Sequence, residues 1–349
     1  MLSALLGLSS LVALSPIALP GGPPVGMDYL AYDAVNARLW VPGGNTGRVD
    51  VVEAATGRVT EIGGLPTAPG APGRANRGPS SATVGERDVW IGDRADRRVC
   101  GFDRRTLARH GCRQLATAPD GLAYVATTHE VWVTTPRAQA ITIIGVKAGE
   151  PTSEASIHLP GSPEGYAVDA ARGVFYTNLE DRDETLAIDV RTRAIIGRWP
   201  TGCGAAGPRG LAIDPARRWL FSACTDGAVG FSLAGKVGRP LGRLRTCGGV
   251  DNIDYDPEAR RLYVASAADG ALTIARVGDD GAPVAETVIG AARGARAVTV
   301  GRHGTAYVAD PRGGRLIVVT PPFTDGRSPQ PDEGACYSHL TYAMPGRVP

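Results

Sequence analysis

A pair of apolar runs recurs seven times along the chain, and this repeat constrains the fold more than any other feature. The first run of each pair is MDYLAYD (27–33), PSSATVG (79–85), PDGLAYV (119–125), PEGYAVD (163–169), PRGLAID (208–214), VDNIDYD (250–256) or ARAVTVG (295–301). The second run begins its core at Leu39, Val89, Val131, Val174, Trp219, Leu262 and Ala306, at intervals of 42 to 50 residues. A repeat of this length is typical of β-propellers, in which each repeat forms one blade.

The runs alternate apolar and polar residues with period two, as in the later segment TLAIDVRTRAII (185–196). This alternation indicates strands with one buried face, and no window keeps a helical period. Four short strands fit within each repeat. We therefore predict an all-β fold, a seven-bladed β-propeller of four-stranded antiparallel blades. The 47 glycines and 27 prolines supply the many turns that such a fold requires.

The repeats predict a single propeller domain over residues 15–323, followed by a C-terminal tail over 324–349. A closed ring needs a fourth strand for the last blade, and that strand must come from one end of the chain. The candidates are SPIALP (15–20) and YSHLTYAM (337–344). We favour the N-terminal segment, because its two prolines suit an outer edge strand.

The first fourteen residues, MLSALLGLSSLVAL, are apolar and carry no side-chain charge, like the central part of a secretory signal. We predict a signal peptide or its remnant over 1–14; the alternative is a strand in a truncated gene product. No later segment is long and apolar enough to span a membrane. The 37 basic and 35 acidic residues nearly balance, which argues against a nucleic-acid partner. We expect a monomer that engages a small molecule or a protein.

Several segments resemble the YVTN-repeat β-propellers, specifically the secreted YncE-like bacterial proteins. The resemblance lies in GMDYLAYDAVNARLWV (26–41), YTNLEDRDETLAIDVRTRAIIGRWP (176–200), PRGLAIDPARRWLFSAC (208–224) and VDNIDYDPEARRLYVASAADGALTI (250–274). It covers most of the chain and is most specific between residues 163 and 274. It implies a seven-bladed fold and an extracytoplasmic, periplasmic or secreted location, but no particular chemistry.

The chain contains six cysteines. Cys100 and Cys112 flank a hairpin turn at equal distances from Thr106, so a cross-strand disulfide is expected there. The resemblance pairs Cys203 with Cys224, whose loops emerge on the same face of a propeller. Cys247 is then left with Cys336, and a Cys224–Cys247 pair is the alternative.

An even number of cysteines that pair in this way indicates an oxidising compartment. The competing interpretation is a metal or redox site built from Cys203, Cys224 and Cys247. The chain has no CxxC motif and these loops contain no histidine, so the sequence does not support a metal or redox site there.

The second residue of each first run is expected at the channel end of its innermost strand. These residues form a ring of Asp28, Ser80, Asp120, Glu164, Arg209, Asp251 and Arg296. As a ligand site, the arginines would hold an anionic group. As a site for Ca²⁺ or another divalent cation, the ligands would be Asp28, Asp120, Glu164 and Asp251, with Asn178 and Asn252. The other interpretation is a ring of ion pairs that fixes the blades.

The remaining candidates are less specific. The loop NLEDRDE (178–184) is expected to be a solvated acidic loop, with weak Ca²⁺ binding as the alternative. The histidines are scattered away from the predicted channel mouth, and neither a GxSxG motif nor a P-loop is present. No catalytic residue is assigned.

Two functions follow. The first is an exported scaffold that binds a ligand or a protein through its top face and channel mouth. The alternative is a divalent-metal-dependent hydrolase of the lactonase type.

Overall fold

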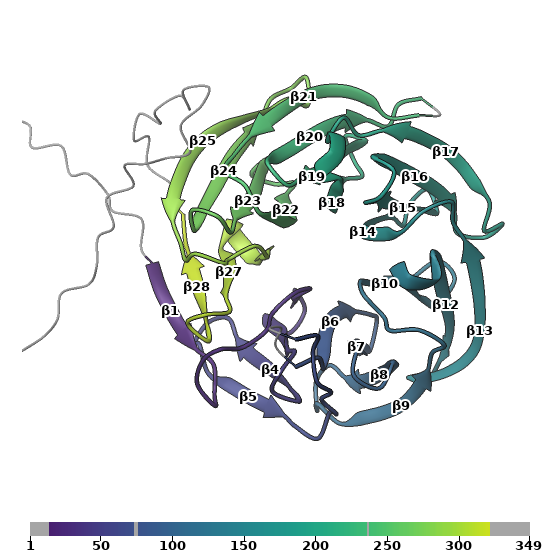
Figure 1. Cartoon of the computed structure of the whole chain (residues 1–349), viewed down its shortest axis with the longest axis vertical. Helices are drawn as coiled ribbons and strands as arrows, with labels where there is room; N and C mark the ends of the chain where they lie inside the picture. Colours follow the sequence, from purple (N-terminus) through teal and green to yellow (C-terminus); the bar gives the residue numbers. More distant parts are fainter. Residues whose placement is uncertain (1–13, 73–75, 236, 322–349) are drawn as a thin grey trace, which may run out of the picture.

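The computed structural model describes residues 14–72, 76–235 and 237–321, and it shows seven four-stranded antiparallel sheets arranged around a central axis (Figure 1). The predicted all-β propeller is therefore confirmed. Successive sheets follow one another around the ring in sequence order, so that each repeat is one blade (Figure 1).

Blade 1 contains β2 (Ala31–Asp33), β3 (Arg38–Gly43), β4 (Arg48–Glu53) and β5 (Val59–Ile62). Blade 2 contains β6 (Pro79–Val84), β7 (Asp88–Asp93), β8 (Arg98–Asp103) and β9 (Arg109–Gln114). Blade 3 contains β10 (Leu122–Val125), β11 (Glu130–Thr135), β12 (Ala140–Lys147) and β13 (Glu150–His158). Blade 4 contains β14 (Pro163–Asp169), β15 (Val174–Leu179), β16 (Glu184–Asp189) and β17 (Ile195–Pro200).

Blade 5 contains β18 (Pro208–Asp214), β19 (Trp219–Cys224), β20 (Gly227–Ser232) and β21 (Arg239–Arg245). Blade 6 contains β22 (Val250–Asp256), β23 (Arg261–Ser266), β24 (Ala271–Val277) and β25 (Pro283–Gly290). Blade 7 contains β26 (Val298–Val300), β27 (Ala306–Asp310), β28 (Arg315–Val319) and β1 (Leu14–Ala18). Three short 3₁₀ turns, η1 (Pro136–Ala138), η2 (Gly204–Ala206) and η3 (Arg302–Gly304), complete the described elements.

Strand β1 closes the ring by pairing with β28, and Ile17 lies opposite Leu316 in this pair. The N-terminal segment thus supplies the fourth strand of blade 7, as the prolines suggested. The tail segment 337–344 does not take this place; it lies outside the described residues. Pro16 is accommodated because β1 is the outermost strand of its sheet and needs no further partner.

The core lies between adjacent blades, where side chains of the second and third strands meet those of the next sheet. Trp40, Trp90 and Trp132 recur at one position of the second strand and are fully buried. Polar turns join the strands; in blade 1, Asp33 Oδ1 accepts hydrogen bonds from the backbone nitrogens of Val35 and Asn36.

Two of the expected disulfides are present. Cys100 lies directly opposite Cys112 in the β8–β9 pair and is bonded to it, and Cys203 is bonded to Cys224. The alternative Cys224–Cys247 pair is therefore wrong, and Cys203 and Cys224 provide no thiolates for a metal or redox site. Cys336, the expected partner of Cys247, lies outside the described residues.

Two disulfides indicate an oxidising environment. Within the described ranges, no helix is long and apolar enough to cross a membrane. The segment 1–13 and the tail from residue 322 are not described, so the predicted signal peptide and domain limits stay predictions.

Candidate functional site

The candidate site is the mouth of the central channel at the end where the first strand of each blade begins, here called the channel mouth. The ring residues lie at or just before the first strands: Ser80, Glu164, Arg209 and Asp251 are within β6, β14, β18 and β22, and Asp28, Asp120 and Arg296 precede β2, β10 and β26. The loops between second and third strands emerge at the same end. Both sets of segments therefore contribute side chains.

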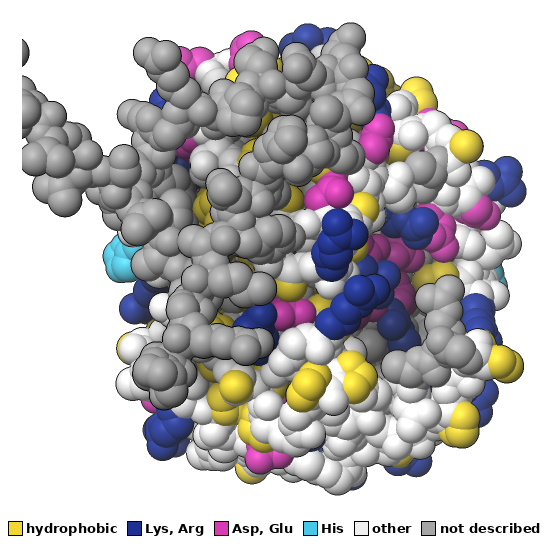
Figure 2. Space-filling view, turned by 60° about the vertical axis from the view of Figure 1, so that its left-hand side comes forward, with side chains coloured by type: hydrophobic (Ala, Val, Ile, Leu, Met, Phe, Trp, Pro, Cys, Tyr) yellow, Lys and Arg dark blue, Asp and Glu magenta, His cyan; other side chains and the backbone are white. Residues whose placement is uncertain are grey.

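Arginines join the carboxylates of the ring. Arg94 Nη2 donates to Asp28 Oδ2 at 2.7 Å and to Asp120 Oδ1. Arg296 Nε lies 3.2 Å from Asp251 Oδ2, and its Nη2 lies 3.7 Å from Asp28 Oδ1. Figure 2 shows acidic and basic side chains lying next to one another on the face that it presents. The structure thus connects Asp28, Asp120, Asp251 and Arg296.

Arg94 was missed by the sequence analysis. It is the first residue after β7, and Glu180 has the equivalent place after β15. Glu180 pairs with Arg209, so charged residues at this position reach the ring in two blades. The available signal was a charged residue directly after a second strand, because that loop opens onto the same end of the channel as the ring.

Glu164 differs from the other ring carboxylates because no ion pair to it is found among the described residues. Burial raises the pKa of Glu164 to about 9, and repulsion from Asp120 and Asp251 adds to this effect. The Glu164 side chain is therefore a neutral carboxylic acid at pH 7, able to donate a hydrogen bond.

The other titrating groups of the mouth are shifted less. Burial raises the pKa of Asp120 to about 6, although Arg94 opposes this shift. Burial and repulsion from Asp28 likewise raise the pKa of Asp251 to about 6. Burial tends to lower the pKa of Arg94, but Asp28 and Asp120 outweigh it and raise that pKa. At pH 7 to 8 both aspartates are thus largely ionised and Arg94 is charged.

Two polar atoms of the ring are buried and have no hydrogen-bond partner in the part of the chain that the structure describes. They are the hydroxyl of Ser80, a residue that is 5% exposed, and Oδ2 of Asp120. Buried polar atoms are almost always paired, so unpaired ones at the mouth of a channel point to a ligand or to ordered water.

A cavity of about 150 Å³ reaches the ring at Asp28 and is otherwise lined mainly by residues of the first strands and the segments just before them. Asn252, which follows the ring residue Asp251, also lines it, and the stacked rings of Tyr29 and Tyr166, 5.9 Å apart, form part of its wall. Gly210 permits the close approach of blade 6, since a Cβ there would lie 2.7 Å from Asn252 Oδ1. The chamber is large enough for a few waters or a small polar group.

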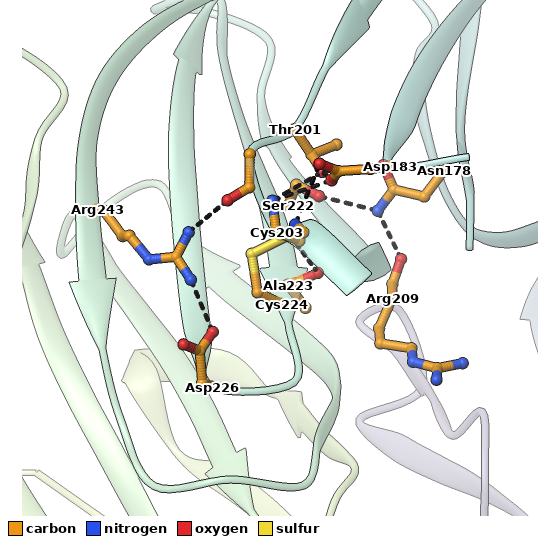
Figure 3. Close-up of a disulfide and its surroundings, with 12 residues drawn as sticks. Asn178, Asp183, Thr201, Cys203, Arg209, Ser222, Ala223, Cys224, Asp226 and Arg243 are labelled. Carbon is orange, nitrogen blue, oxygen red and sulfur yellow. Dashed lines mark hydrogen bonds and ion pairs between the residues drawn. A yellow bond between two sulfur atoms is a disulfide. The ribbon is translucent and has the colours of Figure 1, made fainter. Parts of the chain in front are cut away.

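Asn178 is 0% exposed and holds blades 4 and 5 together (Figure 3). Its Nδ2 donates to the carbonyl oxygen of Arg209 at 2.6 Å and to Ser222 Oγ at 2.9 Å, and its Oδ1 accepts from Thr185 at 2.7 Å. The amide oxygen expected to bind a metal is thus engaged within the protein.

The acidic loop 178–184 also makes internal contacts. Asp183 accepts hydrogen bonds from Thr201 and from the backbone nitrogens of Cys203, at 2.9 Å, and Gly204, at 3.0 Å (Figure 3). Asp181 accepts from the backbone nitrogen of Ser162 at 2.8 Å. The loop therefore supports the Cys203–Cys224 disulfide and the crossing into blade 5.

Among the described residues, no group of three or more His, Cys, Asp or Glu side chains is arranged to hold a metal ion. His129 and His303 lie in turns between first and second strands, and His110 and His158 on outer strands, as expected. His339 lies outside the described residues. The channel mouth can bind a ligand in two ways. It can form hydrogen bonds through Ser80, Asp120 and Glu164, and it can pair charges through Arg94 and Arg296.

No protein-family model matches the chain, and no curated protein matches it. Solved structures similar to it include the hydrazine synthase of Kuenenia stuttgartiensis, with 13% identity, a TM-score of 0.71 and coverage of 86% of this chain and 97% of that one. A virginiamycin B lyase from Staphylococcus aureus has 13% identity, a TM-score of 0.67 and coverage of 88% and 99%. A structure of the mitotic checkpoint complex has 14% identity, a TM-score of 0.71 and coverage of 92% and 96%. At these identities the likeness shows the propeller fold alone, and membership of the YVTN-repeat family stays a prediction.

Proposed function

We propose that the chain is an extracytoplasmic binding protein whose channel mouth takes a small cationic ligand. The observation that carries the proposal is the combination at the mouth of a buried, unpartnered carboxylate oxygen on Asp120 with an unpartnered hydroxyl on Ser80. Both atoms accept hydrogen bonds. Glu164 is close enough to Asp120 to be affected by its charge, and it has no basic partner among the described residues.

The charge balance of the mouth favours a cation. Three arginines of the mouth form ion pairs with four carboxylates, while Glu164 stays neutral. The arginines are Arg94, Arg209 and Arg296, and the carboxylates are those of Asp28, Asp120, Asp251 and Glu180. Carboxylates thus exceed guanidinium groups by one, and ionisation of Glu164 would add a second. A bound cation stabilises ionised Glu164, so binding should release its proton.

Isothermal titration calorimetry at pH 8 tests this, with calcium chloride and putrescine hydrochloride as separate probes. We expect saturable binding of at least one probe, at least tenfold weaker binding by Asp120→Asn, and weaker binding by Glu164→Gln. Glu258→Gln, an exposed carboxylate outside the channel mouth, is the matched control and should bind like the wild type. The proposal is wrong if neither probe binds, or if the control loses binding as much as the mouth variants.

A second candidate function is the divalent-metal-dependent hydrolase. The raised pKa values of Asp120, Glu164 and Asp251 favour it, because a divalent cation would remove the mutual repulsion that contributes to them. Two of the similar structures are lyases, so a fold of this kind is compatible with catalysis. Elemental analysis after Ca²⁺ or Zn²⁺ loading, followed by a lactone hydrolysis assay, tests it. Absence of bound metal, or activity retained by Glu164→Gln, rejects this candidate.

A further inference from the structure

A second cavity, of about 280 Å³, lies beside the Cys100–Cys112 disulfide. Leu65 and Pro66, which follow blade 1, form one side of it. The lining also includes Asp93, the last residue of β7, Asp96 of the β7–β8 loop in blade 2, and Arg109 of β9. The cavity shares no lining residue with the chamber at the channel mouth.

Asp93 is the most informative residue of this cavity. It is 1% exposed, and its Oδ1 accepts a hydrogen bond from the backbone nitrogen of Ala95 at 2.7 Å. Its Oδ2 is buried and has no hydrogen-bond partner among the described residues. A buried carboxylate oxygen without a donor is unfavourable, which indicates that a donor is missing from this place.

Asp96 presents a second oxygen of the same kind. Its Oδ2 lies 3.3 Å from Arg98 Nε, whereas its Oδ1 is buried and lacks a partner in the described chain. Burial raises the pKa of Asp93 to about 6, and the negative charge of Asp96 contributes to the shift. Two acceptors in one cavity call for a ligand with several hydrogen-bond donors and a positive charge.

The other residues that line the cavity differ in character from the two aspartates. The Arg109 side chain forms no hydrogen bond or ion pair with any described residue, while Leu65, Pro66 and the disulfide give apolar surface. A metal ion fits this lining poorly, because it requires more oxygen ligands than the two aspartates supply. The described part of the chain holds no group of three acidic, His or Cys side chains suited to a metal ion.

We propose that this cavity binds a small zwitterion of amino-acid size. Its ammonium group donates to Asp93 Oδ2 and Asp96 Oδ1, its carboxylate group lies toward Arg109, and its side chain contacts Leu65 and Pro66. An ammonium group has three donors, so it satisfies both unpartnered oxygens at once. The site is separate from the proposed function, although Arg94 of the same loop reaches the channel mouth.

Binding is tested by calorimetry at pH 7.5 on the full chain with the twenty common L-amino acids, one at a time. We expect at least one of them to bind saturably. Its N-acetyl derivative should bind at least tenfold more weakly, because acetylation removes the charged donors. Its amide should bind more weakly than the parent compound, because the amide lacks the negative charge that Arg109 attracts.

Asp96→Asn should weaken binding at least tenfold, and Asp93→Asn should abolish it. If Asp93→Asn does not fold, Asp96→Asn and the N-acetyl derivative carry the test. Asp279→Asn is the matched control, because the Asp279 side chain is 95% exposed and lies on blade 6. Glu164→Gln should also bind the amino acid like the wild type, because it changes only the channel mouth. The proposal is overturned if no amino acid binds, if the N-acetyl derivative binds equally well, or if Asp96→Asn binds like the control.

Discussion

Arg94 Nη2 donates a hydrogen bond of 2.7 Å to Asp28 Oδ2, although 66 residues separate them in the sequence. The same nitrogen also donates to Asp120. Because these residues belong to blades 2, 1 and 3, one guanidinium joins three consecutive blades at the channel mouth. The ring of charged residues is thus a structural joint as well as a candidate binding surface.

Arg94→Ala should therefore lower stability. At pH 8 the change leaves the carboxyl groups of Asp28 and Asp120 close together without their shared donor, and we expect a loss on the order of 1–3 kcal/mol. The loss should shrink at pH 5, where Asp120, with a pKa raised to about 6, is already protonated in the folded protein. Urea unfolding at both pH values measures the difference.

Arg245→Ala is the control for Arg94→Ala, because Arg245 is 71% exposed and lies 3.9 Å from Asp226. Exposed pairs of this kind contribute little. Equal losses for the two variants at pH 8, or a loss for Arg94→Ala that does not change with pH, would contradict the role assigned to Arg94.

Glu164→Gln should make the protein more stable above pH 5. Burial raises the pKa of Glu164 to about 9 in the folded protein, while an unfolded glutamate ionises near its ordinary pKa of 4.5. Between these values the unfolded state gains free energy by releasing a proton that the folded state retains, so Glu164 destabilises the fold as pH rises. The gain from Gln should grow from pH 5 to pH 9, reach several kcal/mol because each pKa unit corresponds to about 1.4 kcal/mol, and then level off.

Thermal unfolding of wild type and Glu164→Gln from pH 5 to pH 10 checks this expectation, with Glu258→Gln as the exposed control. A gain that is the same at all pH values would show that Glu164 is not held neutral by its surroundings.

The Cys203–Cys224 disulfide should contribute about 3 kcal/mol, because it closes a loop of 21 residues in the unfolded chain. We expect the double change Cys203→Ala and Cys224→Ala to lower the midpoint of thermal unfolding by several degrees. Mass-spectrometric mapping without reduction should find one peptide linking the two cysteines. Free thiols at both positions in protein exported to an oxidising compartment would contradict the pairing.

Closure of the ring depends on residues near the N-terminus. Leu19, directly after β1, is 4% exposed and packs in a cluster with Val41 of blade 1 and Leu316 of blade 7. We expect Leu19→Ala to cost about 2–4 kcal/mol, because it opens a cavity where the first and last blades meet. Val284→Ala, on the outer strand of blade 6 and 58% exposed, should change the free energy of unfolding by less than about 1 kcal/mol.

The fold was predictable because its signal is repeated. Each blade has the same alternation and turn spacing, so the irregular first strand of blade 1, only Ala31–Asp33, did not hide the pattern. The ring positions and the Cys100–Cys112 pair followed from the same register. The two prolines of segment 15–20 favoured the N-terminal strand as the one that closes the ring, and its pairing with β28 confirms this choice.

The contacts of the site were not predictable in the same way. Which arginine pairs with Asp28 depends on side-chain reach between blades, and Arg94 lies outside the repeat run from which the ring was derived. Asn178 was grouped with possible metal ligands because its sequence position is near the mouth. Its hydrogen bonds to blade 5 appear only when the blades are packed together.

Asn178→Ala separates the two interpretations of this residue. The change leaves the carbonyl of Arg209 and the hydroxyls of Thr185 and Ser222 without their buried partner, so we expect a stability loss of about 2–3 kcal/mol. Affinity for a cation at the channel mouth should stay within about twofold of the wild type at a temperature where the variant is folded, since the amide oxygen is already engaged by Thr185. Chemical unfolding and calorimetry with calcium chloride measure the two effects. A large loss of Ca²⁺ affinity with unchanged stability would instead identify Asn178 as a ligand.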